Sequence, residues 1–249
     1  MRASIFCKFI VSALFYVLIS ITGSAQISRE ATANSYLERG INWMSKGEVA
    51  RAKADFDLAI ASDPKAAVAY CHRGIVNLKN SNFEAANTDF NHALELNPNY
   101  VEAYLNRGIS KRNQGELEAA ILDFNQALKI DPQAADAYNN RAAVFYLQKK
   151  FDEALQDLNV ALKLNPHLAL AFHDRGVIRH LKNDVTGAIS DYDQALKIDP
   201  KFARTYLNRG IAKLEQGNRK EAEKDFAASV KLRPDLKNII EQVFKLEKK

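Results

Sequence analysis

The sequence predicts an all-α protein, a solenoid of six stacked helix pairs. The first observation is the spacing of the only six prolines, each 34 residues after the last: Pro64, Pro98, Pro132, Pro166, Pro200 and Pro234. The second is that alanine, arginine and aspartate recur in phase with them. The third is a composition of 47% hydrophobic and 26% charged residues, which is typical of a folded chain. A fixed period of this length indicates stacked supersecondary units.

Placing each proline at position 32 divides the sequence into six repeats. Their bounds are 33–66, 67–100, 101–134, 135–168, 169–202 and 203–236. Residues 26–32 then form a short lead-in, and residues 237–249 follow the last repeat. Position numbers below count residues within a repeat.

Each repeat has the periodicity of two helices. Positions 4, 8 and 11 share one face of a first helix, and positions 20, 24 and 27 share one face of a second. In the third repeat Ala120 allows close approach of the two backbones, Phe124 fills the space beside them, and Pro132 ends the second helix. We therefore predict structural roles for these three residues. Residues suited to left-handed backbone lie between the helices, at Gly47, Gly115, Asn183 and Gly217.

Arginine stands at position 7 and aspartate at position 23 of all six repeats, as in Arg107 and Asp123. Two interpretations are open. The arginines could form a basic ladder for phosphate or carboxylate, or each could pair with an aspartate of an adjacent helix in a bidentate ion pair. Equal numbers at a fixed spacing favour the ion pairs, so both residues are predicted to be structural.

The pattern Y-x-x-R-G…A-x-x-D-F-x-x-A…D/N-P resembles bacterial tetratricopeptide repeat proteins with Arg-Gly at positions 7 and 8. The resemblance covers 204 of the 249 residues. It implies a right-handed superhelix whose concave groove, lined mainly by the first helix of each pair, receives a peptide or helix of another protein. These repeats serve many unrelated partners, so the resemblance is specific for fold rather than for function.

The resemblance also implies that positions 2, 5, 6, 9, 12 and 13 line the groove. From these positions we select a set of candidate partner-binding residues, centred on the third to fifth repeats. They are Leu105, Asn106, Ile109, Arg112, Asn139, Asn140, Tyr146, His173, Asp174, Val177, His180, Leu181 and Asn208. Leu105, Ile109, Tyr146, Val177 and Leu181 are the expected apolar anchors.

Two groove positions have a distinct character. Position 9 is aliphatic in every repeat, which fits either a binding strip or packing against the neighbouring repeat. Position 6 carries Asn106, Asn140 and Asn208, and is similar to the asparagine ladder of O-GlcNAc transferases, whose amides grip a peptide backbone. Asp174 is one of the residues that interrupt this ladder.

The N-terminus predicts a signal peptide over residues 1–25. Arg2 and Lys8 precede an uncharged apolar run of about 14 residues, shorter than the ~20 that span a bilayer. Small residues then lead to a cleavage site after Ala25. We expect a secreted, periplasmic or cell-envelope protein. The alternative is an uncleaved membrane anchor over residues 5–25.

The sequence offers no pattern for catalysis, a cofactor or a metal. No histidine lies four residues from another, so the sequence lacks the pair of histidines at i and i+4 with which a helix binds zinc. His173 and His180 could bind a stray metal, but we expect them instead to make partner affinity sensitive near pH 6 to 7. A net charge of +5, without clustered basic and aromatic residues, does not indicate nucleic-acid binding. Neither a cofactor nor a small-molecule substrate is expected.

A last helix over residues 237–249 is expected to cover the final repeat, with Leu236, Ile239, Ile240, Val243 and Leu246 on its apolar stripe. Membrane binding by this stripe is the competing interpretation. Taken together, the sequence predicts a non-enzymatic scaffold that binds a protein or peptide. The alternative is a self-assembling component of an envelope-associated complex, so a homo-oligomer stays open.

Overall fold

The computed structural model describes residues 26–247, together with their side chains up to Lys245. The predicted signal peptide therefore lies outside the described residues. The chain forms two compact units, whose boundary in the sequence lies between Gln114 and Gly115. Every regular element from residue 26 to residue 247 is helical, in agreement with the predicted all-α class.

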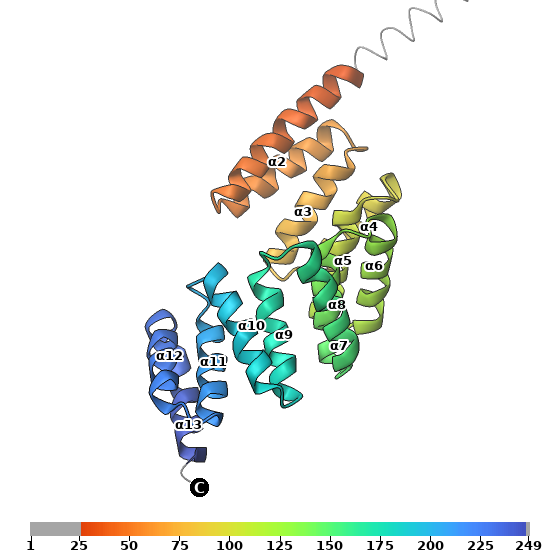
Figure 1. The fold of residues 1–249 in the computed structure, drawn as a ribbon. Helices are drawn as coiled ribbons and strands as arrows, with labels where there is room; N and C mark the ends of the chain where they lie inside the picture. Colours follow the sequence, from red (N-terminus) through yellow and green to blue (C-terminus); the bar gives the residue numbers. More distant parts are fainter. Residues whose placement is uncertain (1–25, 248–249) are drawn as a thin grey trace, which may run out of the picture. The chain divides into compact units, whose positions relative to one another are not determined.

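The first unit holds the helices of the first two repeats and the first helix of the third. Residues 26–45 are helical, so the lead-in 26–32 continues directly into the first repeat. The helices that follow are α2 (Val49–Ser62), α3 (Ala67–Lys79), α4 (Phe83–Leu96) and α5 (Val101–Gln114). Within this unit α3 packs extensively against α4, its partner in the second repeat, and α4 packs in turn against α5 (Figure 1).

The second unit continues the same alternation to the C-terminus. Its helices are α6 (Leu117–Ile130), α7 (Ala135–Leu147), α8 (Phe151–Leu164), α9 (Ala169–Leu181), α10 (Val185–Ile198), α11 (Ala203–Glu215) and α12 (Arg219–Leu232). A 3₁₀ turn, η1 (Pro234–Leu236), leads into α13 (Lys237–Glu247). Helices α7 and α8, α9 and α10, and α11 and α12 are the most closely packed pairs (Figure 1).

The turn inside each repeat is made by one residue with left-handed backbone at position 15. Gly47, Gly115 and Gly217 have φ between 77° and 83°, and Asn183 has φ of 63°, as the sequence predicts. The structure adds Ser81 and Lys149, both with φ of 59°, although neither residue type favours this region. The turn is thus a property of the helix pair, and the residue at position 15 adapts to it.

The centre of a typical repeat is a contact between glycine at position 8 and an aromatic ring at position 24. A Cβ added to Gly74 would lie 2.6 Å from Cε1 of Phe90, and one added to Gly210 would lie 2.6 Å from Cε1 of Phe226. The ring therefore occupies the space that a side chain on the first helix would need. The small residue at position 8 is required because the ring is fully buried against its backbone.

Helix α13 covers the apolar end of the last pair. Leu236 and Ile240 are buried in one cluster with Ala222 and Phe226, and Val243 and Phe244 pack against it. The rings of Phe226 and Phe244 meet edge to face with centroids 5.4 Å apart. Two details of the predicted stripe change: Ile239 is 44% exposed, and Phe244, which the stripe omitted, takes a place in the core. The side chain of Leu246 is outside the described part.

Candidate functional site

The arginines at position 7 are held by aspartates of their own repeats. Each guanidinium donates from Nε and Nη2 to the carboxylate at position 23, with Nη2–Oδ1 distances of 2.6 or 2.7 Å in the five repeats where the pair lies in one unit. The pairs are Arg39–Asp55, Arg73–Asp89, Arg141–Asp157, Arg175–Asp191 and Arg209–Asp225. This geometry agrees with the ion-pair interpretation and leaves no basic ladder from these five arginines. Arg107 and Asp123 belong to different units, and their pairing stays a prediction.

A second acceptor for the same arginines was not predicted. Nη1 of each arginine from the second repeat on donates to position 25 of the preceding repeat. The acceptors are Asp57, Asn91, Asn125, Asn159 and Asp193. We call these five bonds the inter-repeat bonds. The signal in the sequence was the restriction of position 25 to Asp or Asn in the first five repeats.

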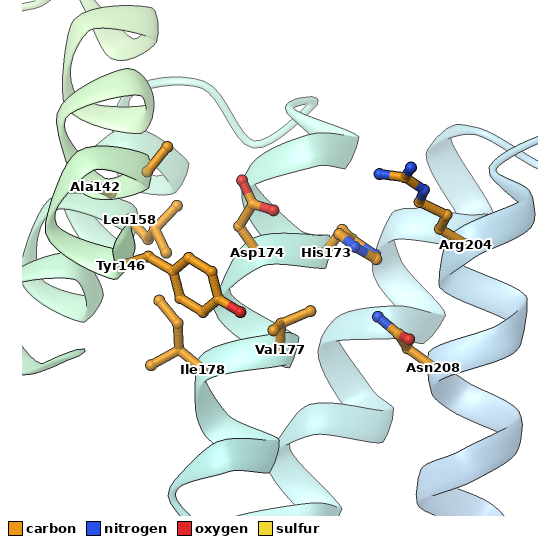
Figure 2. Close-up of a pocket in the computed structure, with 10 residues that line it drawn as sticks. Ala142, Tyr146, Leu158, His173, Asp174, Val177, Ile178, Arg204 and Asn208 are labelled. Carbon is orange, nitrogen blue, oxygen red and sulfur yellow. The ribbon is translucent and has the colours of Figure 1, made fainter. Parts of the chain in front are cut away.

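The second unit has a pocket of about 330 Å³ on its row of first helices. Its walls come from α7, α9 and α11, with one side chain of α8 at its base (Figure 2). The lining residues are Ala142, Ala143, Tyr146, Leu158, His173, Asp174, Val177, Ile178, Arg204 and Asn208. Five of the predicted partner-binding residues, Tyr146, His173, Asp174, Val177 and Asn208, thus meet around one cavity.

The pocket lies where the fourth repeat departs from the common interior. Here position 8 is Ala142 rather than glycine, and position 24 is Leu158 rather than an aromatic ring. Both side chains are buried in one cluster, and both line the pocket. An aliphatic side chain is smaller than a ring, and we infer that this exchange leaves the space that the pocket occupies.

His173 is a structural member of the pocket wall. It is only 8% exposed, and its Nδ1 lies 2.9 Å from Oγ1 of Thr205 on α11. Its ring also packs against Phe202, with centroids 4.7 Å apart. Burial, with a smaller effect of the positive charge of Arg204, lowers the pKa of His173 to about 4. The expectation that His173 makes binding sensitive near pH 6 to 7 is therefore wrong, because it is neutral throughout that range.

The polar groups of the pocket lie on α9 and α11. Asp174 is half-buried on α9, and Arg204 and Asn208 stand one turn apart on α11 (Figure 2). Arg204 is exposed, and it has no hydrogen bond or ion pair with any residue that the structure describes. Sequence reasoning placed it at groove position 2 but did not select it. The signal was the change from Asp136 and Leu170 at that position to arginine in the sixth repeat.

The groove asparagines are less available as donors than the sequence suggests. Nδ2 of Asn106 donates to the carbonyl of Glu102, and Nδ2 of Asn140 donates to that of Asp136, both at 2.8 Å within their own helices. Asn139 is buried, and its Oδ1 accepts no hydrogen bond from the residues that the structure describes, so it belongs to the interior rather than to the pocket lining.

The other predicted groove residues do not line the pocket. Nε2 of His180 lies 2.7 Å from Oε2 of Glu215, and Leu181 at the end of α9 is 55% exposed. Four predicted residues lie on α5 of the first unit, where their side chains are half-buried: Leu105, Asn106, Ile109 and Arg112. The structure thus gathers one part of the predicted set around the pocket, and a role for the four residues of the first unit stays a prediction.

Within residues 26–247, no three His, Cys, Asp or Glu side chains are grouped so that they could hold a metal ion. Cys71 is buried, and burial raises the pKa of its thiol to about 12, which suppresses the reactive thiolate. None of the helices in this range combines the length and apolar character needed to cross a membrane.

Family models identify the repeats. Residues 110–149 and 176–217 match a model described as TPR repeat. Models described as tetratricopeptide repeat match residues 135–168, residues 90–121, and residues 67–100 with 203–236. Three of these segments have the bounds of the second, fourth and sixth repeats defined above. No curated protein sequence matches the chain.

Solved structures share the fold at low sequence identity. PilF of Pseudomonas aeruginosa is 19% identical, with a TM-score of 0.78 over 88% of this chain and 99% of that chain. PilW, described as a widely conserved type IV pilus biogenesis factor, is 20% identical, with a TM-score of 0.74 over 85% and 98%. YrrB, described as a TPR protein with an unusual peptide-binding site, is 21% identical, with a TM-score of 0.58 over 78% and 98%. The chain is accordingly a solenoid of six helix pairs with a C-terminal capping helix.

Proposed function

We propose that this chain, whose helix pairs are tetratricopeptide repeats, is a non-enzymatic scaffold that binds a peptide or helix of a partner protein. The binding site is the pocket between α7, α9 and α11. Five of the six repeats have Arg-Gly at positions 7 and 8, and this supports placing the chain in the Arg-Gly subtype of the bacterial family.

The observation that carries this proposal is an exposed aromatic side chain beside an apolar cavity. Tyr146 is 38% exposed, although it stands on a helix whose other face is buried. Val177 and Ile178 continue the apolar surface, and a few polar groups border it (Figure 2). Concave apolar surfaces with a few polar groups at the border are typical of binding sites, and partly exposed tyrosines often anchor partners.

The test is affinity capture with the purified full chain and a matched pair of variants. Val177→Asp places a charge in the pocket, and we expect the captured partner to be lost. Leu122→Asp is the control, since Leu122 is 69% exposed on α6 and does not line the pocket. A partner captured equally by both variants would place binding on another surface.

We propose further that the scaffold works outside the cytoplasm, in the periplasm or cell envelope, or secreted. The support is the charged start, apolar run and small residues of the first 25 residues. PilW, which shares the fold, is a type IV pilus biogenesis factor by description. N-terminal sequencing of the protein recovered from fractionated cells should begin at Gln26. A chain that keeps residues 1–25 and stays in the membrane would instead support the anchor.

The sequence also allows self-assembly, and light scattering separates this alternative from partner binding. We expect the mass to stay that of one chain over a hundredfold range of concentration. Defined oligomers that persist in Val177→Asp but not in Leu122→Asp would favour assembly through the second helices of the repeats, to which α6 belongs.

A further inference from the structure

We propose that the pocket recognises a partner segment in which a bulky apolar residue lies about three residues from a carboxylate that pairs with Arg204. This inference rests on the proposed function and names the chemistry of the bound segment. It follows from two features of the pocket: its two compartments, and an arginine that has no hydrogen bond or ion pair among the residues that the structure describes.

The first compartment is apolar. Figure 2 shows Tyr146, Leu158 and Ile178 facing the space between α7 and α9, with Ala142 above them and Val177 at the border toward α11. Because Leu158 and Ile178 are almost fully buried, the floor of this compartment is a fixed surface rather than a mobile one. The whole pocket has a volume of about 330 Å³, so it admits one large side chain and not a folded element.

The second compartment carries positive charge. Arg204 and Asn208 border it on α11, across His173 from the apolar space (Figure 2). In five repeats the position-7 arginine is fully engaged by two acceptors or a bidentate carboxylate, whereas Arg204 has no ion pair among the described residues. A guanidinium of this kind is matched by a carboxylate, which it can bind through two parallel hydrogen bonds.

The remaining charges near Arg204 restrict where an acid can bind. Asp174 lies on α9 on the other side of His173, so the positive charge of the pocket lies on the side of α11 (Figure 2). Asp235, in η1, interacts electrostatically with Arg204 but pairs with Arg233 at 2.5 Å. His173 is neutral and adds no charge. The favourable place for an acid is therefore over α11, next to Arg204 and Asn208.

The distance between the compartments sets the spacing of the motif. Packed helices lie about 8–10 Å apart, and the acidic site is one helix beyond the apolar compartment. An extended chain covers about 3.3 Å per residue, so about three residues separate the two groups.

The experiment is a selection of random twelve-residue peptides displayed on phage, with the full chain as bait. Peptides enriched on the unmodified chain should carry Leu, Phe, Met or Tyr with Asp or Glu two to four positions away. On Arg204→Glu the same selection should enrich Lys or Arg at that position. Lys231→Glu, which makes the same charge change at an exposed site on α12, should leave the acidic preference intact.

Affinities of one enriched peptide measured by fluorescence polarisation give the second readout. Arg204→Gln should weaken binding by about fivefold, and replacing the peptide's acid by its amide should have the same effect. Both changes together should cost no more than either alone, because they remove one interaction. Circular dichroism confirms that the variants are folded.

The outcomes separate the two proposals. The selected peptides could bind through the pocket, so that Val177→Asp abolishes their enrichment, and yet carry no acidic residue near the apolar one. This result would overturn the inference and keep the proposed function. Identical acidic peptides selected by Arg204→Glu would overturn it as well. Peptides enriched equally on Val177→Asp, or no enrichment at all, would contradict the proposed function and the inference together.

Discussion

Repeats four (135–168) and five (169–202) fold as the same helix pair but fill it with different side chains. In repeat five Gly176 leaves room for Tyr192, and a Cβ added there would lie 2.6 Å from Cε1 of the ring. In repeat four Ala142 has that Cβ, and Leu158 takes the place of the ring. The difference shows that the size of the side chain at position 8 determines which side chain fits at position 24.

The difference also has a consequence for the site. Ala142 and Leu158 line the pocket, whereas Gly176 and Tyr192 do not. Repeat four also differs from repeat five at position 15, where Lys149 rather than an asparagine adopts left-handed backbone. The repeat with the unusual interior is therefore the one whose position-8 and position-24 side chains line the cavity, together with residues of repeats five and six.

The largest expected effect is the loss of the ring in repeat five. Tyr192→Ala should lower the free energy of unfolding by about 3–5 kcal/mol, because the ring is fully buried against Gly176. Urea unfolding followed by circular dichroism measures it. The exposed Leu122→Ala is the control and should change stability by less than about 0.5 kcal/mol. A similar small change in Tyr192→Ala would show that the ring contributes little to the pair.

Position 5 should make the contribution of repeat five to stability depend on pH, because it is His173 there and the uncharged Asn139 in repeat four. The pKa of His173 is about 4 in the folded chain, below its unfolded value of about 6.5, so between these values only the unfolded chain binds the proton. Stability should therefore fall by about 3 kcal/mol as the pH drops from 6.5 to 4.

Unfolding curves measured across this range, for the chain and for His173→Asn, provide the check. The variant should lose this part of the pH dependence, and His180→Asn, the control, should keep it. An unchanged slope in His173→Asn would mean that other groups cause the dependence.

A double-mutant cycle converts the interior of repeat five into that of repeat four. Gly176→Ala alone should destabilise by about 1–3 kcal/mol, because its Cβ meets the Tyr192 ring. With Tyr192→Leu present, the same change should cost nothing or stabilise, since alanine favours helix by about 1 kcal/mol over glycine. Thermal and urea unfolding of the four proteins give the coupling energy. Additive effects would show that the two positions are independent.

The smallest expected effect concerns the turn of repeat four. Lys149→Gly should stabilise by about 0.5–1 kcal/mol, because glycine adopts a φ of 59° without strain. Asn183→Gly, at the same position of repeat five, should change stability by only a few tenths of a kcal/mol, since asparagine tolerates this region. The difference between the two variants in urea midpoint is the measurement. Equal effects would remove the distinction.

The sequence predicted what every repeat shares, because a shared packing problem leaves a periodic pattern. Prolines, alanines and the glycine–ring pairs therefore located the helices. It did not predict Ser81 and Lys149 as left-handed turn residues, since neither residue type favours that backbone. It did not identify the acceptors at position 25, because their donors come from the following repeat.

The candidate site was predictable only in part. Position numbers placed Tyr146, Val177 and Asn208 on the groove face, and the structure brings them to one pocket. The sequence could not show that His173 is buried against Thr205, or that the asparagines use their own N–H groups within the helix. These contacts depend on which residues are neighbours in the folded chain, and the residues involved do not recur at the same position of every repeat.

The inter-repeat bonds give the array a direction. Each repeat from the second on supplies a donor, and the repeat before it supplies the acceptor, so the chemistry of the two ends differs. Position 25 of the last repeat is Ala227, which offers no side-chain acceptor. A duplicated copy of repeat four placed directly after the original would find an arginine and an acceptor at both new junctions. The arginine of a seventh repeat joined after residue 236 would find no side-chain acceptor at position 25 of the sixth repeat. The array can therefore be lengthened from within more readily than after its last repeat.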